Sequence, residues 1–428
     1  MRLRWIVRTA LLYPLVLLAS QPAAAQVGVE MVPAETDSSN QAAWWRPVVV
    51  KGNTTYVAFN SPGDTAGTHR IKIGVKVGTG NWTIGFLKDE NGNVWSHEDD
   101  VGHDQPTIAV DGDGYIHVWA DHHVDDWRYF RSSAPNDPTA MLRRIGSMPG
   151  TVGATYPIAE HAPNGDVYLI IRNHFSGAGQ GELYRWNNTA DSWSTMGIFA
   201  RENTNFVYPD DLKIDDAGNV HIAFEWAYGT PRALRHYGSY LKYDVAAGVF
   251  RTANGTALSA PATRATPNLL FQGLGSGEVW NNSNDGVGIQ AAGLTVDQYA
   301  RPSIAYRYRT AGGSNALNYD VYRIRWNGSA WSDKVKIYTA SNNVPAAVET
   351  THNGTRARVY FTVSGVGLMA AESPGWAVRP VATGQPGVSR ISGILTGITQ
   401  DVIYAAAPTQ IDANRGRVYI MTIGDVLP

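Results

Sequence analysis

The amino-acid sequence predicts an all-β protein, and more specifically a seven-bladed β-propeller of four-stranded antiparallel blades. Three observations lead to this prediction: the composition, a recurring strand-turn-strand pattern, and the spacing of its copies. The 428 residues include 44 glycines, 14 tryptophans and 21 tyrosines, and only 17% are charged. Such a composition is typical of many short strands joined by tight turns. Long amphipathic helical patterns are hard to find.

The recurring pattern is a short apolar strand, a turn rich in Asn, Asp and Gly, and a strand of alternating polarity. Self-similarity of this kind indicates a repeat architecture. The clearest copies are IAVDGDGYIHVWA (108 to 120), IAEHAPNGDVYLII (158 to 171) and LKIDDAGNVHIAF (212 to 224), with fainter copies at 48 to 59, 294 to 306, 348 to 361 and 409 to 421. Their turns fall at Gly52, Gly114, Gly165, Gly218, Ala300, Gly354 and Gly416. Most steps between these turns leave room for four strands, which gives seven blades whose first strands line a central channel.

Aromatic residues recur about thirty residues after several of these turns, and we expect them on the outer strand of each blade. They are Trp82, Trp193, Phe250 and Trp331. The longest step between turns contains residues 259 to 286, which are rich in Gly, Pro and Asn. Long loops in compact domains are more often functional than not, so we expect this loop to lie over the site.

The first 25 residues have the layout of a cleavable export signal: the basic segment MRLRWIVR, an apolar run, and SQPAAA before Gln26. The apolar run is too short to span a bilayer. We therefore expect a secreted or periplasmic protein in which residues 26 to 428 form one propeller domain. Removal of the signal takes away three arginines and no acid, so the formal charge of −2 becomes −5. This balance argues against a nucleic-acid partner, and the absence of cysteine excludes disulfides and thiolate metal sites.

Histidines flank the turn of the second copy symmetrically. His103 lies ten residues before Asp113 and His123 ten residues after it. Antiparallel pairing of the flanking strands returns the two imidazoles to one level at the rim of the channel. His122 is the weaker neighbour, because it faces the opposite way to His123 if the strand continues.

The next two copies repeat this symmetry with other residues. Tyr156 and Arg172 lie eight residues on either side of Asn164, and Tyr208 and Trp226 lie nine residues on either side of Ala217. Further along the chain, RALRHYGSY supplies three more candidates for substrate binding, Arg235, His236 and Tyr240. By contrast, His117 and His221 occupy the same position of their repeats (YIHV and NVHI), which indicates an architectural role.

An imidazole, a phenol and an arginine at one rim favour β-elimination on a uronic acid. An arginine neutralises the carboxylate best when it binds it with two parallel hydrogen bonds, and Arg172 is the candidate. A base then removes the C5 proton while an acid protonates the leaving O4, roles that are open to histidine and tyrosine. The product carries a 4,5-unsaturated uronate. A glycosidase would instead need two acids flanking the glycosidic bond.

Five segments resemble the BNR-repeat propeller proteins that include bacterial ulvan lyases. They are HDQPTIAVDGDGYIHV, HHVDDWRYFRS (122 to 132), TYP (155 to 157), IRNHFSGAGQGELYRW (171 to 186) and VYPDDLKIDDAGNVHIAFEW (207 to 226), and the resemblance extends over about residues 45 to 245. It implies a seven-bladed propeller and a lyase acting on rhamnose–glucuronate linkages, in ulvan or in a related polysaccharide. The catalytic positions that it implies are His103, His123, Tyr156 and Arg172, with Tyr208 on the substrate side. Some members hold a zinc ion with a cysteine ligand, and this chain has no cysteine, so we expect no metal and no cofactor.

Two other functions stay open. A sialidase-like hydrolase is suggested faintly by KDENGNVW (88 to 95), and Asp104, Asp121, Asp210 and Glu225 could supply its acids. A non-catalytic carbohydrate-binding propeller could use Trp119, Trp127, Trp226 and Trp280 as stacking platforms. The product distinguishes them, because elimination alone gives ultraviolet absorbance. In each case we expect a monomer with a carbohydrate partner, an anionic uronate polysaccharide if the protein is a lyase.

Overall fold

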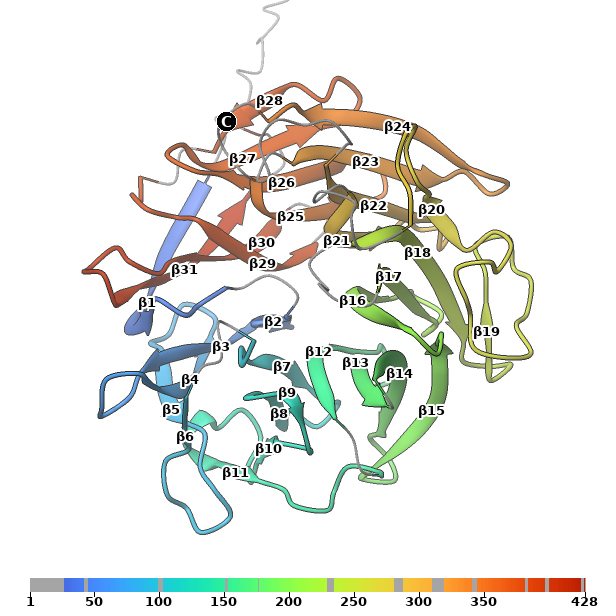
Figure 1. Ribbon diagram of the computed structural model, residues 1–428. Helices are drawn as coiled ribbons and strands as arrows, with labels where there is room; N and C mark the ends of the chain where they lie inside the picture. Colours follow the sequence, from blue (N-terminus) through green and yellow to red (C-terminus); the bar gives the residue numbers. More distant parts are fainter. Residues whose placement is uncertain are drawn as a thin grey trace, which may run out of the picture.

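A computed structural model shows four-stranded antiparallel units arranged radially around a central axis, which is a β-propeller (Figure 1). It describes residues 27–41, 45–98, 103–150, 153–175, 177–228, 235–280, 288–309, 319–340, 345–381, 384–396, 400–424 and 427. In these ranges the one helix is a 3-10 turn, η1 (Pro138–Ala140). The all-β prediction is confirmed. The proposed export signal, residues 1 to 25, lies outside the described residues.

The units follow one another along the chain. The first contains β2 (Val48–Lys51), β3 (Thr54–Pro62), β4 (Thr68–Val77) and β5 (Thr83–Phe86), with β6 (Ser96–Glu98) paired to β4. The second contains β7 (Thr107–Val110), β8 (Ile116–Trp119), β10 (Tyr129–Ser132) and β11 (Met141–Arg143). The third contains β12 (Ala154–His161), β13 (Val167–Phe175), β14 (Ala178–Asn187) and β15 (Ser192–Ala200), and β9 (His123–Asp125) pairs with β12.

The following units have the same order. The next contains β16 (Asn205–Ile214), β17 (Val220–Tyr228), β18 (Arg235–Asp244) and β19 (Val249–Arg251), with β20 (Leu270–Gln272) paired to β18. After it come β21 (Gly288–Val296), β22 (Pro302–Arg309), β23 (Asp320–Trp326) and β24 (Trp331–Tyr338), then β25 (Pro345–His352), β26 (Ala357–Val363), β27 (Gly367–Glu372) and β28 (Val378–Pro380). A bridge between β14 and β16 joins the third and fourth units into one ten-stranded sheet.

The last sheet is completed by the N-terminal end of the domain. Its order is β1 (Val27–Asp37), β31 (Arg415–Ile423), β30 (Asp401–Ala407) and β29 (Arg390–Thr396). Antiparallel pairing of β1 with β31 therefore joins the first and the last strand that the structure describes, with β1 on the outside (Figure 1). The sequence patterns did not predict this strand.

The inner strands surround the axis. The contacts run from β2 through β7, β12, β16, β21 and β25 to β29, and β29 in turn contacts β2. The first strand of each hairpin thus lines the centre, as expected from the repeat.

The predicted turns join the first and second strands in six of the copies. Five of them place glycine at positive φ, at Gly52, Gly114, Gly165, Gly218 and Gly354. Ala300 adopts φ 56° in the corresponding turn, a conformation that a residue with a Cβ rarely takes. Trp193, Phe250 and Trp331 lie on the outer strands β15, β19 and β24, and Trp82 directly precedes β5, which agrees with the predicted aromatic repeat.

The seventh predicted turn is wrong by one hairpin. Gly416 lies inside β31, paired with Thr36 of β1, and the first hairpin of that sheet joins β29 to β30. Residues 409 to 421 resemble an inner hairpin because any antiparallel hairpin shows apolar, turn and alternating segments in that order. β29, β30 and β31 are the first, second and third strands of this sheet. Residues 409 to 421 therefore cover the turn between the second and third strands and most of the third strand.

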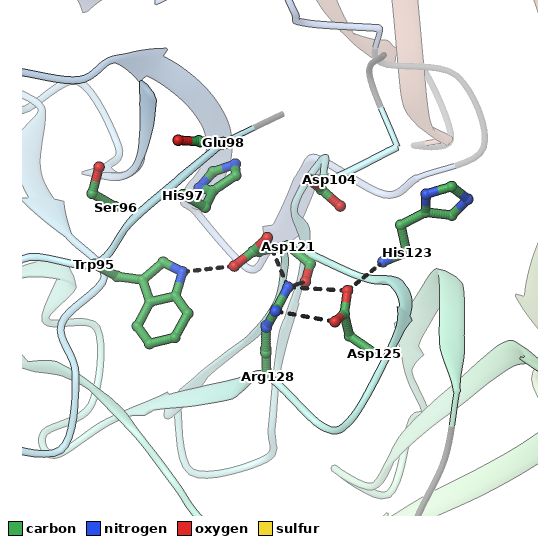
Figure 2. A pocket seen from close by; sticks show the side chains of 9 residues that line it. All are labelled: Trp95, Ser96, His97, Glu98, Asp104, Asp121, His123, Asp125 and Arg128. Carbon is green, nitrogen blue, oxygen red and sulfur yellow. Dashed lines mark hydrogen bonds and ion pairs between the residues drawn. The ribbon is translucent and has the colours of Figure 1, made fainter. Parts of the chain in front are cut away.

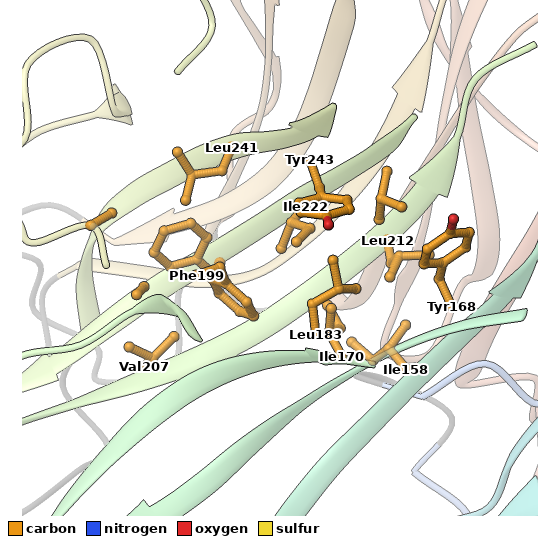
Figure 3. Close-up of a cluster of buried hydrophobic side chains, with 14 of the residues drawn as sticks. Ile158, Tyr168, Ile170, Leu183, Phe199, Val207, Leu212, Ile222, Leu241 and Tyr243 are labelled. Carbon is orange, nitrogen blue, oxygen red and sulfur yellow. The ribbon is translucent and has the colours of Figure 1, made fainter. Parts of the chain in front are cut away.

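The hydrophobic core is divided into clusters between neighbouring units. Figure 3 shows the cluster between the β12–β15 and β16–β19 units, with Ile170, Leu183, Phe199, Ile222 and Leu241 fully buried. Alternate residues of a strand face opposite sides of its sheet, so each inner or middle strand contributes to two clusters. Truncating one of these side chains to alanine is expected to cost about 2–5 kcal/mol.

The repeat histidines are architectural, as predicted. His117 is fully buried, with Nε2 3.0 Å from Asp111 Oδ2 and Nδ1 2.7 Å from the Tyr129 hydroxyl. His221 makes the same two contacts in its own unit, at 3.1 Å to Asp215 Oδ2 and 2.6 Å to the Tyr240 hydroxyl.

Each aspartate also accepts two backbone N–H groups of the turn that follows it. Burial lowers the pKa of both imidazoles. Each neutral ring can therefore donate through Nε2 to the aspartate and accept through Nδ1 from the tyrosine.

Candidate functional site

Two inner strands are irregular at or directly after the predicted tyrosines. The register of β12 shifts between Thr155 and Ile158, and that of β16 shifts between Pro209 and Asp211. Tyr156 adopts φ 56° in the first of these irregularities, a conformation that costs of order 1–3 kcal/mol. Such irregularities re-aim side chains. The rings of Tyr156 and Tyr208 lie 5.4 Å apart although they come from neighbouring units.

The two predicted rim histidines lie face to face. The rings of His103, just before β7, and His123, at the start of β9, stack with centroids 4.2 Å apart and an interplanar angle of 3°. His123 is exposed and His103 is half-buried. The His103 ring also lies 5.9 Å from that of Tyr156. The histidine pair of the second unit therefore adjoins the tyrosine of the third.

The guanidinium group of Arg172 lies against the rings of the two tyrosines. Its guanidinium carbon is 4.8 Å from the centre of the Tyr156 ring and 4.6 Å from that of Tyr208, and the residue is only 2% exposed. Its Nε and Nη1 are buried and have no hydrogen-bond partner in the structure. Gly179 on the adjacent strand makes room for the side chain, because a Cβ there would lie 2.9 Å from Arg172 Cδ.

A second arginine extends the group. The guanidinium carbon of Arg235 lies 3.9 Å from the centre of the Tyr208 ring, and its Nη1 donates to Glu225 Oε1 at 2.8 Å. Burial raises the pKa of Glu225 to about 7, although Arg235 opposes this shift. Burial also raises the pKa of Tyr156, against the opposing effect of the Arg235 and Arg172 charges. Tyr156 is therefore a protonated phenol at neutral pH, which can donate a proton.

The structure thus brings together six of the predicted site residues: His103, His123, Tyr156, Arg172, Tyr208 and Arg235. The sequence reasoning missed two neighbours, Trp45, whose ring is 5.6 Å from that of Tyr156, and Glu225 in its role as the partner of Arg235. Trp45 precedes the first repeat copy, so no repeat position pointed to it. The sequence indicates Glu225 only as a candidate acid of a sialidase-like hydrolase.

The remaining four predicted residues are buried elsewhere. Trp226 is fully buried in the hydrophobic cluster between the β12–β15 and β16–β19 units and donates from Nε1 to Ser239 Oγ, and Tyr240 is the buried partner of His221. His122 Nε2 accepts from the backbone N–H of Arg128, and burial lowers the pKa of this imidazole to about 3. His236 is 1% exposed, beneath the ring of Trp280. These placements favour structural roles for all four residues.

A pocket adjoins the histidine pair on the side of the first unit. It has a volume of about 490 Å³, and its lining includes His123, Asp104 and Arg128 (Figure 2). Within the described ranges, no three His, Asp or Glu residues are grouped so that they could hold a metal ion. No helix in those ranges is long and apolar enough to cross a membrane.

Two solved structures share this fold along most of their length. One is described as an ulvan lyase of polysaccharide lyase family PL25 bound to -[GlcA(1-4)Rha3S]-, with 15% identity, a TM-score of 0.68, and coverage of 92% of this chain and 95% of that one. The other is the polysaccharide lyase Uly1, with 14% identity, a TM-score of 0.66, and coverage of 89% and 90%. At these identities the likeness establishes a common fold. No curated protein sequence matches significantly.

A family model is more informative, because it matches most of the chain. The model of the BNR repeat-containing family aligns with residues 54–337, from the first unit to β24. This range contains His103, His123, Tyr156 and Arg172, together with the second, third and fourth units. The chain therefore belongs to the BNR repeat-containing family, with the fold of the ulvan lyases.

Proposed function

We propose that the protein is a polysaccharide lyase that cleaves uronate-containing chains by β-elimination, with rhamnose–glucuronate linkages as the favoured substrate. The observation that carries the proposal is the environment of Arg172. Two of its nitrogens are buried without a partner, and its guanidinium lies against the protonated phenol of Tyr156, whose ring adjoins that of His103 in the stacked pair. Buried donors of this kind are costly unless a ligand satisfies them. The two oxygens of a uronate carboxylate match the edge of a guanidinium that is formed by its two Nη atoms, so such a ligand would satisfy Nη1.

Neutralisation of the carboxylate by Arg172 makes the C5 proton removable. The base takes that proton, the C5–H electrons form the C4=C5 double bond, and the C4–O4 bond breaks. The acid donates a proton to the departing O4, so the charge balances. We assign the base to the His103–His123 pair. We assign the acid to Tyr156, because the raised pKa of Tyr156 keeps its phenol protonated. The ring of Tyr208 contacts the guanidinium groups of both Arg172 and Arg235, and it supports the orientation of Arg172.

We also propose that the domain is a monomeric seven-bladed propeller over residues 26 to 428, exported after removal of residues 1 to 25. The grouping of strands into units of four supports the count, as does the sequence of contacts from one inner strand to the next. The packing of the β1 unit against the β2 unit, through Val32, Phe59 and Tyr404, supports closure. A crystal structure with six or eight blades would contradict it.

Incubation of the purified protein with a panel of uronate polysaccharides tests the activity. Elimination produces new reducing ends together with the ultraviolet absorbance of 4,5-unsaturated uronates. Reducing ends without absorbance would instead indicate a hydrolase. Binding without turnover would indicate a carbohydrate-binding propeller, and either result would overturn the lyase proposal.

A further inference from the structure

The pocket beside His123 is the most suggestive feature outside the elimination group. Its walls come from β6 and the residues before it, from the segment that leads into β7, and from the connection between β8 and β10 (Figure 2). Its volume of about 490 Å³ lies in the range of small-molecule sites. Because His123 belongs both to this lining and to the stacked pair, a ligand unit in the pocket would adjoin the reacting unit.

The lining is dominated by carboxylates. Glu98, Asp104, Asp121 and Asp125 all contribute, and Arg128 is the one lysine or arginine among the lining residues. The Arg128 guanidinium is directed at two of these acids, with Nη1 2.8 Å from Asp121 Oδ1 and Nη2 3.1 Å from Asp125 Oδ1. Its charge is therefore compensated inside the protein. The four carboxylates outnumber the one guanidinium in the lining, so the pocket carries an excess of negative charge.

A buried imidazole in the same wall points to a polar ligand. His97 is 7% exposed, and neither of its ring nitrogens has a hydrogen-bond partner in the structure. Figure 2 shows the ring beside Glu98 at the edge of the pocket. Burial, with a smaller contribution from the His69 charge, lowers the pKa of His97 to about 3, so this ring adds no positive charge. A neutral imidazole both donates and accepts one hydrogen bond, which matches a sugar hydroxyl.

We propose that this pocket is a subsite for an uncharged, unsulfated sugar unit next to the uronate that is cleaved, with its hydroxyl groups bound by Asp104 and His97. Carboxylates accept hydrogen bonds from hydroxyl groups, whereas they repel a sulfate ester or a second uronate. The assignment rests on the proposed lyase function, because Arg172 is taken to hold the uronate. It narrows the substrate class to polymers in which the neighbouring sugar carries no sulfate.

The test compares two substrates with one backbone: a sulfated rhamnose–glucuronate polysaccharide and its chemically desulfated form. We expect kcat/KM for elimination to be about tenfold higher or more on the desulfated polymer, because a sulfate ester would be held close to like charges in the pocket. Asp104→Asn should lower the ratio of kcat/KM on the desulfated polymer to kcat/KM on the sulfated polymer several-fold. Glu98→Gln should narrow it too, and this second variant guards against misfolding because Glu98 is exposed. Glu90→Gln, at an exposed turn outside the pocket, is the matched control and should leave the ratio unchanged.

A binding measurement separates this proposal from the lyase proposal. Calorimetric titration with tetrasaccharides of both forms reports the subsite without requiring turnover. If elimination occurs with equal or greater efficiency on the sulfated polymer, the subsite is wrong and the lyase proposal stands. If no elimination occurs but the desulfated tetrasaccharide binds more tightly, and Asp104→Asn narrows the difference in affinity, the pocket is a binding site for an unsulfated sugar and the lyase proposal fails. Absence of both elimination and binding overturns both.

Discussion

Two pairs of histidines in this protein have opposite surroundings. His117 and His221 are fully buried, and each ring places one nitrogen beside an aspartate and the other beside a tyrosine hydroxyl of its own unit. By contrast, the rings of His103 and His123 stack on each other, and the His103 ring adjoins that of Tyr156. The first pair recurs with the repeat, and the second occurs in one unit only. A residue that breaks the repeat is the better candidate for chemistry.

The same contrast holds for the tyrosines. Tyr129 and Tyr240 occupy equivalent places against the repeat histidines, and burial raises the pKa of both phenols. Tyr156 lies instead within an irregularity of β12, Tyr208 lies just before one in β16, and both contact the guanidinium of Arg172. Regular strands thus hold the architectural pairs, and local irregularities accompany the other pair.

The largest effect is expected from removing an imidazole of the rim pair. If the pair supplies the base, His103→Ala or His123→Ala should lower kcat for elimination by about 10²–10⁴. The melting temperature should change little for His123, because its side chain is exposed. Initial rates of ultraviolet absorbance on an accepted uronate polymer measure the effect. Loss of less than tenfold in both variants would place the base elsewhere.

Arg172→Lys tests the neutralising group. Lysine keeps the charge but lacks the planar fork, so we expect turnover to fall by about 10²–10³, the loss typical of removing one preorganised donor. Arg185→Lys is the matched control, since Arg185 pairs with Asp166 at 2.6 Å on the outer part of its unit. Near-full activity in Arg172→Lys would remove the main support for the lyase mechanism. Circular dichroism should show both variants folded.

Gly179→Ala should act on the same guanidinium without altering any charged group. The added Cβ would lie 2.9 Å from Arg172 Cδ and 2.8 Å from Phe206 Cδ1, so the arginine must move. Misplacement of a catalytic group by about 1 Å can cost up to 10²-fold, and we expect a fall in kcat of about 10- to 100-fold. Gly375→Ala, where an added Cβ meets nothing within 4 Å, is the control. Equal activity of the two variants would show that the position of Arg172 is not critical.

The sequence predicted the site best where the hairpins are regular. In an antiparallel hairpin, residues that lie equally far from the turn along the sequence are neighbours across the two strands. Equal distances from Asp113 and from Asn164 therefore predict that His103 lies opposite His123 and that Tyr156 lies near Arg172. For the β16–β17 hairpin, the same reasoning predicts that Trp226 lies opposite Tyr208. Tyr208 pairs there with Glu225, and Trp226 lies one residue further along, on the opposite face and inside the core. A symmetric offset gives the height of a residue on its strand but not the face that it occupies.

Those parts of the fold that depend on residues close together in the sequence were predictable. Turns and alternating strands identified the repeat and its inner hairpins. The pairing of β1 with β31 joins residues almost 400 positions apart, and no local pattern reports it. For the same reason Gly416 was assigned to an inner hairpin, although it lies on the strand that pairs with β1. Contacts such as that of Trp45 with Tyr156 also depend on how the units pack.

The smallest effect on turnover, and the clearest contrast with the rim pair, is expected for His117→Gln. Glutamine cannot reach both Asp111 and Tyr129 as the ring does, and a buried partner left unsatisfied costs about 1–3 kcal/mol, so the free energy of unfolding should fall at pH 7. The elimination rate at 25 °C should stay near that of the wild type.

The pH dependence of His117→Gln gives a second signature. Burial lowers the pKa of His117 in the folded state, so below the ordinary value of about 6.5 the unfolded chain binds more protons, and wild-type stability falls as the pH falls. The variant lacks this contribution. Its melting temperature should therefore fall less than that of the wild type between pH 7.5 and 5.5. A variant with wild-type stability at pH 7 but strongly reduced turnover would show that His117 takes part in the chemistry, and the distinction between repeating and non-repeating histidines would fail.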